Sequence, residues 1–211
     1  MKTGLLFDLD GTLLDTLDDL MDATNHILAQ NGYPTRTRQE IRAFVGNGAR
    51  NLLAKAAPEG DADALLAQFQ PYYAAHCQVK TRPYPGILEV LAQLVQRYPV
   101  AIVSNKPDGA VKALCDELFP GIPAMGERPD CPRKPAPDMV YRAMEMLGVE
   151  RCIYIGDSEV DVVTAQNAGV PCVSVLWGFR DKEEIKAAGG TIFCEKTENL
   201  PEILEELCRG Q

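Results

Sequence analysis

The chain has 211 residues, 46% hydrophobic and 24% charged, which is enough to bury one large core or two small ones and excludes a disordered protein. Its 30 acidic and 21 basic residues give a formal charge of −9, which disfavours nucleic-acid and anionic-membrane partners, whereas clustered carboxylates suit a hard divalent cation. The N-terminal apolar run is only residues 5–7, so we expect no signal peptide, and no stretch is apolar enough to span a membrane. Seven cysteines without a Cys-x-x-Cys pair favour free thiols in a reducing cytoplasm.

The first predicted element is an apolar strand over residues 4–8, of the kind that is buried on both faces of a parallel sheet. The segment 15–82 that follows contains no convincing strand. Its apolar side chains recur at helical spacing, and Thr37 with Glu40 forms a capping-box pattern at a helix start. This segment is therefore predicted to be a cap domain of three or four helices, inserted directly after the first strand.

Beyond residue 82, short apolar strands alternate with helical segments. The predicted strands are 100–104, 152–156, 171–176 and 191–194, and the predicted helices are 86–97, 107–118, 138–147, 159–168, 183–188 and 201–208. Gly148 and Gly169 stand where two of these helices would end. The alternation predicts the α/β class: a doubly wound, Rossmann-like parallel sheet core of residues 1–14 and 83–211, with the α-helical bundle cap inserted into it.

Two carboxylates follow the first predicted strand at once. Asp8 closes the strand, and Asp10 is two residues further on. Ligands of open α/β sheets bind beyond the carboxyl ends of the strands, so both acids are candidates for a site there. Like charges this close repel each other unless a cation bridges them. Gly11 permits a sharp exit from the strand, and Thr12 adds a hydroxyl and a backbone N–H.

Three further strand or helix ends carry polar side chains. Asp157 ends the predicted strand 152–156, and Asp161 lies one helical turn later on the same side. Ser104, at the end of strand 100–104, precedes Asn105 and Lys106, and Lys134 stands just before a helix that begins with proline. Carboxylates collect a divalent cation, while lysine, hydroxyl and N–H groups collect an anion. A site with both indicates phosphoryl transfer.

Four motifs, in this order, resemble those of the haloacid dehalogenase-like hydrolase superfamily, and most of all its phosphoglycolate phosphatase group with a helical cap. They are Asp-Leu-Asp-Gly-Thr at 8–12, Ser-Asn-Lys at 104–106, Lys-Pro-Ala-Pro-Asp at 134–138 and Gly-Asp-Ser-Glu-Val-Asp at 156–161. The resemblance covers essentially the whole chain. It implies a Mg²⁺-dependent phosphatase that acts on a small phosphorylated metabolite.

The resemblance also implies roles for the motif residues. Asp8 would be the nucleophile that forms an aspartyl-phosphate, and Asp10 the general acid and then the general base. Mg²⁺ would be held by Asp8, the backbone carbonyl of Asp10 and Asp157, with Asp161 supporting the metal waters or Lys134 from nearby. The residues implied to hold the phosphoryl group are Thr12, Ser104, Asn105 and the catalytic Lys134.

Other activities of the same superfamily are separated by single residues. Asp10 argues against a dehalogenase, which lacks this second acid. A phosphonatase needs a reactive cap lysine, and neither Lys55 nor Lys80 stands in a setting that marks it as reactive. A hexose-phosphate mutase or a pyrophosphatase shares every motif and differs mainly in cap contacts, so both stay open. A catalytically silent binding module is less expected, because such a module would be expected to lose a motif acid or the motif lysine.

The cap segment 45–50 is the candidate specificity loop. Its two glycines allow a close approach of the backbone, and Arg50 could pair with a substrate carboxylate, as in 2-phosphoglycolate. A solvated arginine at a glycine-rich helix start is an equal alternative. The expected partner is therefore a small phosphate ester, without nucleic acid or membrane, and the protein is expected to be a monomer or a homodimer.

Overall fold

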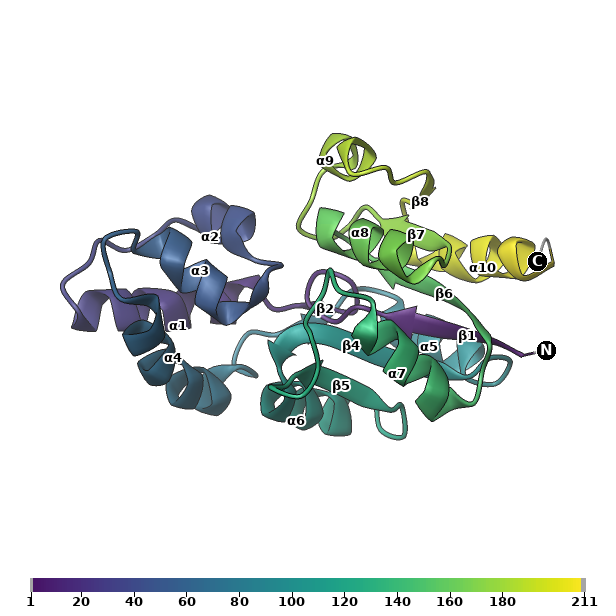
Figure 1. The fold of residues 1–211 in the computed structure, drawn as a ribbon, viewed down its shortest axis with the longest axis horizontal. Coiled ribbons are helices and arrows are strands. Elements are labelled where there is room, and N and C mark those ends of the chain that lie inside the picture. Colours follow the sequence, from purple (N-terminus) through teal and green to yellow (C-terminus); the bar gives the residue numbers. More distant parts are fainter. Residues whose placement is uncertain (1, 210–211) are drawn as a thin grey trace.

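The computed structural model describes residues 2–209, and a six-stranded parallel sheet lies at its centre (Figure 1). In the order β5-β4-β1-β6-β7-β8, the strands are Ala124–Glu127, Val100–Pro107, Thr3–Phe7, Arg151–Gly156, Cys172–Val175 and Ile192–Cys194. Every pairing in this sheet is parallel. The strand order reverses direction at β1, and ligands of such sheets bind beyond the carboxyl ends at this switch point.

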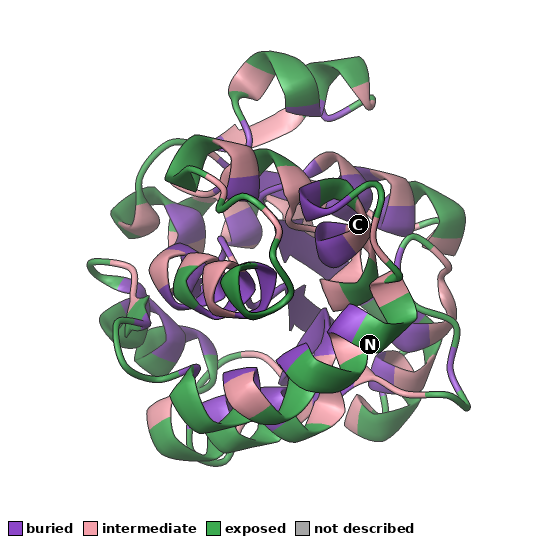
Figure 2. Ribbon diagram, turned by 90° about the vertical axis from the view of Figure 1, so that its left-hand side faces the viewer, coloured by how far each residue is buried: buried purple, intermediate pink, exposed green. Residues whose placement is uncertain are grey.

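Helices cover both faces of the sheet. They are α5 (Ile87–Leu94), α6 (Asp108–Leu118), α7 (Asp138–Leu147), α8 (Glu159–Ala168), α9 (Lys182–Ala187), the short η1 (Thr197–Asn199) and α10 (Leu200–Arg209). Leu6 of β1 packs in the cluster that contains α7 and α8, whereas Leu5 and Phe7 pack in the cluster that contains α5, α6 and α10. Figure 2 shows the buried strands enclosed by helices whose outer sides are exposed. The predicted doubly wound α/β class is confirmed.

The predicted helical cap is present at one end of the sheet (Figure 1). Its helices are α1 (Leu17–Gln30), α2 (Arg38–Phe44), α3 (Gly48–Ala56) and α4 (Ala62–His76). The capping box of Thr37 and Glu40 at the start of α2 is confirmed. The chain leaves and re-enters the core through β2 (Leu14–Asp15) and β3 (Arg82–Pro83), which pair antiparallel. Placing the domain boundaries at 14/15 and 82/83 stays a prediction, and both fall within this ladder.

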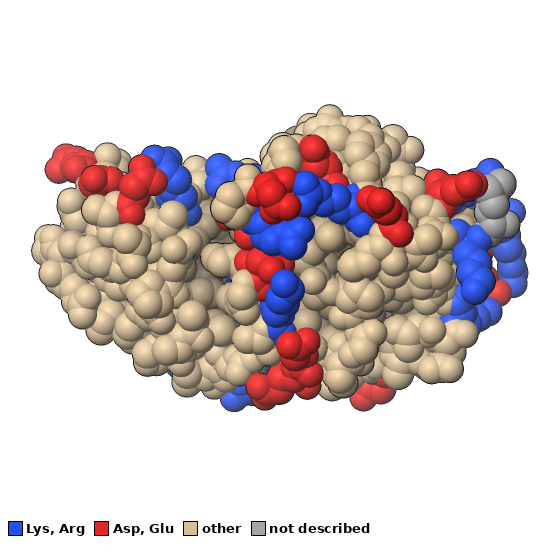
Figure 3. Space-filling view, turned by 60° about the horizontal axis from the view of Figure 1, so that its bottom comes forward, with Lys and Arg blue, Asp and Glu red and all other residues tan. Residues whose placement is uncertain are grey.

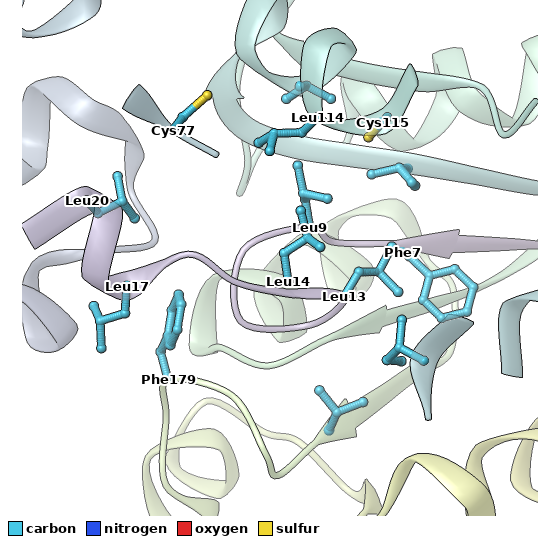
Figure 4. Packing of buried hydrophobic residues seen from close by; sticks show 14 of the residues in the cluster. Phe7, Leu9, Leu13, Leu14, Leu17, Leu20, Cys77, Leu114, Cys115 and Phe179 are labelled. Carbon is cyan, nitrogen blue, oxygen red and sulfur yellow. The ribbon is translucent and has the colours of Figure 1, made fainter. Parts of the chain in front are cut away.

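A continuous apolar cluster joins the cap to the core (Figure 4). It runs from Phe7 of β1 through Leu13 and Leu14 in the connection to Leu17 and Leu20 of α1, all at most 6% exposed. Burial of apolar surface contributes roughly 25 cal/mol per Å², so this cluster favours a cap packed onto the core.

In the six-stranded sheet, two strand assignments differ by more than one residue from the sequence prediction. β4 continues to Pro107, three residues beyond the predicted end at 104, and so carries the Ser-Asn-Lys motif inside the strand. β5 was not predicted, because Ala-Met-Gly-Glu contains no apolar run. Its pairing with β4 requires Gly126, where a Cβ atom would lie 2.5 Å from the carbonyl oxygen of Lys106. The strand thus depends on a close backbone approach that composition does not reveal.

The surface mixes charges of both signs. On the face drawn in Figure 3, acidic and basic side chains lie side by side, and the two signs are not separated into broad fields. Ion pairs such as Arg133–Glu127 and Arg142–Asp130 also bring charges of opposite sign together. Within residues 2–209, no helix has the length and apolar character needed to cross a bilayer.

Candidate active site

The site begins at the carboxyl end of β1, where Asp8 directly follows the last strand residue. Leu9 N donates a hydrogen bond to Asp8 Oδ1 at 2.7 Å. β4 and β6 flank β1, so Ser104 and Asp157 come to the same pocket from its two sides. Asp8 is 8% exposed. The central strand therefore places a largely desolvated carboxylate at the point where polar groups from both neighbouring strands meet.

Lys134 is the buried cation of the site. Its Nζ lies 2.8 Å from Asp8 Oδ1 and 2.8 Å from Asp161 Oδ1, and it donates to Tyr154 Oη at 3.0 Å. Burial by itself would lower the pKa of Lys134, but Asp161 and Asp8 outweigh it and raise that pKa well above its ordinary value. The side chain thus stays an ammonium that offsets two carboxylates and can also hold a phosphoryl oxygen.

Asp8, Asp157 and Asp161 form a buried acidic cluster, in which one oxygen of each carboxylate lies within 4.8 Å of the others. Burial, followed by repulsion from Asp161, raises the pKa of Asp157 to about 7. The same two causes raise the pKa of Asp8 well above its ordinary value, against the opposing effect of Lys134. Because buried acids ionise readily only beside a cation, and because the donors are hard oxygens, this cluster fits a divalent metal ion.

Asp161 is fixed by groups of the protein itself. Ser158 N and Oγ donate to its Oδ2 at 3.1 and 2.6 Å, which completes a capping box at the start of α8. Lys134 and Tyr154 donate to its Oδ1. With donors on both oxygens, Asp161 has the surroundings of a supporting group.

Asp157 has fewer partners than Asp161. Phe179 N donates to its Oδ2 at 2.6 Å, and the Thr12 hydroxyl donates to its Oδ1 at 3.3 Å. The sequence assigned Thr12 to the phosphoryl group, but its hydroxyl here contacts the acidic cluster. Trp177 Nε1 in turn donates to the Thr12 carbonyl at 3.0 Å, so the segment after β7 helps to hold the loop after β1.

Asp10 has different partners from Asp8, although the two acids are only two residues apart. Its Oδ1 accepts hydrogen bonds from Lys106 Nζ at 2.7 Å and from Thr16 Oγ1 at 2.5 Å. Its Oδ2 lies 3.5 Å from the donating Ser104 hydroxyl. Distinct surroundings for two neighbouring acids are what a division between nucleophile and acid–base catalyst requires.

Sequence reasoning missed a buried pair formed by Lys106 and Tyr73. Lys106 is 6% exposed and Tyr73, from α4 of the cap, is 2% exposed; Lys106 Nζ donates to Tyr73 Oη at 2.7 Å. Burial opposes the charge of Lys106, but Asp10 and Tyr73 outweigh it and raise its pKa. The motif contained the lysine, but a tyrosine at helical spacing looks like an ordinary cap core residue, so only the fold could join the two.

The cap closes the pocket with a largely apolar wall. Its apolar side chains are Leu20, Val45, Ala49, Leu52 and Phe69, and Phe179 adds to them from the core. Gly46 and Gly48 of the candidate specificity loop also line the pocket, with φ angles of +119° and +79° that favour glycine. The loop therefore lies at the pocket, and its role in specificity stays a prediction.

Two residues predicted to bind substrate have their polar groups paired with other groups of the protein. Arg50 lies outside the pocket lining, where its guanidinium donates to both Asp63 oxygens at 2.7 and 2.8 Å on the cap surface. Its side chain is 52% exposed, and its partner Asp63 lies in the first turn of α4. Asn105 lines the pocket, but its amide donates to the carbonyls of Gly46 and Lys134 and accepts from Lys134 N. It joins a cap loop to the lysine loop.

Arg180 was also missed, and it is a second link between core and cap. It is 6% exposed and donates to the carbonyls of Val45 at 2.6 Å and Arg42 at 2.8 Å, at the end of α2. Its Nε donates to Glu159 at 2.8 Å. The guanidinium therefore has its donors directed at the cap and at α8, and it closes one side of the pocket.

Comparisons with known proteins agree with this geometry. The family model described as "Haloacid dehalogenase-like hydrolase" matches residues 5–175. A phosphoglycolate phosphatase of Mesorhizobium japonicum is 33% identical and covers 98% of this chain and 96% of its own, and one of Rhodobacter capsulatus is 37% identical over 85% and 87%. A crystal structure from Lactobacillus delbrueckii subsp. bulgaricus has a TM-score of 0.86 and 39% identity, and covers 96% of this chain and 98% of that one.

Proposed function

The chain belongs to the haloacid dehalogenase-like hydrolase family, and from this membership we propose that it is a Mg²⁺-dependent phosphatase of a small, phosphoglycolate-like phosphomonoester. One observation carries the proposal: Lys134 is buried between Asp8 and Asp161, beside Asp157, in the pocket that Asp10 also lines. An anionic carboxylate can attack an anionic phosphate only where positive charge offsets their repulsion. Lys134 and a divalent ion bound by the acidic cluster would supply that charge beside Asp8.

In the first transfer, an oxygen of Asp8 attacks phosphorus and the bond to the leaving oxygen breaks. Asp10 donates a proton to that oxygen, so the product leaves as an alcohol and Asp8 becomes an aspartyl-phosphate. Lys134 offsets the charge on the phosphoryl oxygens. Ser104 lies within reach of the same pocket and offers a hydroxyl.

In the second transfer, Asp10 takes a proton from a water molecule, which attacks the phosphorus of the aspartyl-phosphate. The bond between phosphorus and the Asp8 oxygen breaks, which releases inorganic phosphate and restores the carboxylate. A divalent ion held by Asp8, Asp157 and the Asp10 carbonyl would supply charge neutralisation for the phosphoryl group. Asp161 would keep Lys134 in position through its 2.8 Å contact.

The cap wall supports a small ester over the alternatives. A hexose phosphate carries several hydroxyl groups, and an apolar wall of Leu20, Leu52 and Phe69 would leave most of them without hydrogen-bond partners. This disfavours the mutase. Neither Lys55 nor Lys80 lines the pocket, and Lys80 pairs with Asp22 at 2.6 Å, so a phosphonatase has no support either.

Phosphate release from a panel of esters tests the proposal. With Mg²⁺, the wild-type protein is expected to hydrolyse 2-phosphoglycolate faster than glucose 6-phosphate or pyrophosphate, and EDTA should stop turnover. Asp8→Asn should abolish release while the protein stays folded, because an amide is not a nucleophile toward phosphate. No turnover of any ester by the wild-type protein with metal, or an active Asn variant free of deamidation by mass, would overturn the proposal.

A further inference from the structure

Lys106 and Tyr73 present polar groups to the pocket that phosphoryl transfer does not use. The Lys106 ammonium has three N–H groups, and Asp10 and Tyr73 each accept one, at 2.7 Å. The Tyr73 hydroxyl accepts from Lys106, and among the described residues no acceptor for its own proton is within hydrogen-bond distance. Both side chains line the pocket and are at least nine-tenths buried. One N–H and one O–H thus remain available to a ligand.

The side chains around this pair in the pocket are apolar or already paired with other groups of the protein. Leu52 and Phe69 offer no polar atom, and Arg180, the other cation of the pocket mouth, is directed at Glu159 and at cap carbonyls. A buried ammonium beside a hydroxyl binds an anionic oxygen better than any neutral group, because charge-assisted hydrogen bonds are roughly twice as strong as neutral ones.

We propose that Lys106 and Tyr73 form the leaving-group subsite, which binds a carboxylate on the part of the substrate that departs from phosphorus. The proposal rests on the proposed phosphatase function and deepens it by naming the residues that would recognise the substrate carboxylate. It also replaces Arg50, which lies outside the pocket, as the residue that recognises the substrate carboxylate.

The position of the subsite limits the size of the leaving group. Asp10 protonates the leaving oxygen in the proposed reaction, and Lys106 Nζ is 2.7 Å from the Asp10 carboxylate. A group that contacts Lys106 is therefore close to the leaving oxygen, and one or two carbon atoms are enough to connect them. A longer leaving group would have to lie against the apolar side chains that line the same pocket. A two-carbon acid such as glycolate fits this spacing.

Lys106 also contacts Asp10, so a loss of activity on its removal could reflect Asp10 alone. Tyr73 separates the two effects, because its hydroxyl contacts Lys106 and makes no hydrogen bond to Asp10. Tyr73→Phe removes one oxygen and keeps the ring that packs at 5.1 Å from Phe69. A pair of esters that differ only at the carboxylate then reports recognition of the carboxylate, since any change in Asp10 affects both esters alike.

The experiment compares kcat/KM for 2-phosphoglycolate and for 2-hydroxyethyl phosphate, which has a CH₂OH group in place of the carboxylate. The wild-type protein is expected to prefer phosphoglycolate. Tyr73→Phe should reduce this preference about 10-fold, and Lys106→Met about 10- to 100-fold while also lowering kcat for both esters. Free glycolate should inhibit hydrolysis of 2-hydroxyethyl phosphate competitively in the wild-type protein, and more weakly in both variants.

Arg50→Gln is the matched control, because it removes a positive charge from the cap outside the pocket; it should leave the preference unchanged. A wild-type preference that both subsite variants retain would overturn the subsite and leave the phosphatase assignment intact. Equal wild-type hydrolysis of both esters would overturn recognition of a carboxylate, again without touching the phosphatase assignment. A wild-type protein that hydrolyses no ester would overturn the proposed function and the subsite with it. If Lys106→Met fails to fold, Tyr73→Phe alone decides.

Discussion

Lys134 shows how much one residue can depend on its surroundings. In the sequence it is a single lysine before a proline, and in the structure it is 2% exposed between two carboxylates. A buried pair adds little net stability compared with apolar side chains, but removing one partner leaves the other charge without compensation. Lys134 therefore offsets the negative charge of the buried acidic cluster, which would otherwise destabilise the fold.

Lys134→Met is expected to destabilise the metal-free protein by about 3 kcal/mol at neutral pH, because Asp8 and Asp161 would face each other without a cation. It should also reduce kcat by about 10²-fold or more, since a charge that stabilises the transition state is lost. Urea unfolding and steady-state kinetics measure the two effects. Lys112→Met, which removes an exposed lysine paired with Asp108, is the control and should change neither. A Lys134 variant with wild-type stability and turnover would contradict the role assigned to this lysine.

At the scale of elements, the helices were predicted with bounds close to those observed, and the sheet was predicted without one strand. Helices 138–147 and 159–168 have the predicted bounds, and Gly148 and Gly169 end them in the left-handed conformation. Both helices have local signals: an apolar period and a terminal glycine. β5 has none, because it exists through its pairing with β4 across Gly126. Elements held by long-range contacts were those that local patterns could not predict.

Gly126→Ala is expected to destabilise the protein by about 1–3 kcal/mol, because the new Cβ atom would lie 2.5 to 2.7 Å from backbone atoms of Lys106 and Asp108, which cannot move cheaply. Denaturant unfolding measures this cost. Gly109→Ala is the matched control: its Cβ would have no atom within 4 Å, and alanine has the higher helix propensity, so stability should stay equal or rise by up to about 1 kcal/mol. Equal stability of the two variants would mean that the end of β4 is not held as described.

At the scale of the whole molecule, the pocket exists only where the cap meets the core. Arg180 and Asn105 of the core donate to carbonyls of the cap loop at Val45 and Gly46, and the apolar cluster in Figure 4 continues from β1 into α1. The chain passes between the two parts through β2 and β3, which pair as a two-residue antiparallel ladder. In the proposed reaction, a cap closed in this way would exclude water while the aspartyl-phosphate forms.

The stability of the whole metal-free molecule should fall as the pH rises from 5 to 8. Burial and Asp161 raise the pKa of Asp157 from 3.8 to about 7, and the pKa of Asp8 is raised as well. The folded protein then binds more protons than the unfolded chain between these values, so each increase in pH favours unfolding. The surface acids with lowered pKa values act in the opposite sense, but only below this range.

Mg²⁺ competes with those protons, so it should stabilise the protein more at pH 8 than at pH 5. Thermal unfolding in EDTA and in Mg²⁺ at both pH values measures this difference. Asp157→Asn should reduce the pH dependence in EDTA, since one of the two buried carboxyls with a raised pKa is gone. A metal-free wild-type protein that gains stability from pH 5 to 8 would show that the acidic cluster does not hold protons as described.

The sequence by itself determined the α/β class, the inserted helical cap, the family and the set of acids and lysines that gather at the pocket. These follow from local information: apolar periods, glycine caps and motifs at the ends of strands. Only the tertiary structure decided which of these groups contact one another. In the structure, Asp10 accepts a hydrogen bond from Lys106, and the amide of Asn105 binds backbone groups. Arg50 lies outside the pocket, where it pairs with Asp63. Tyr73 and Arg180, which the sequence did not single out, line the pocket. The physical reason is that these contacts join residues of the cap and the core that are tens of positions apart in the sequence, such as Tyr73 and Lys106. No short stretch of sequence encodes such a contact.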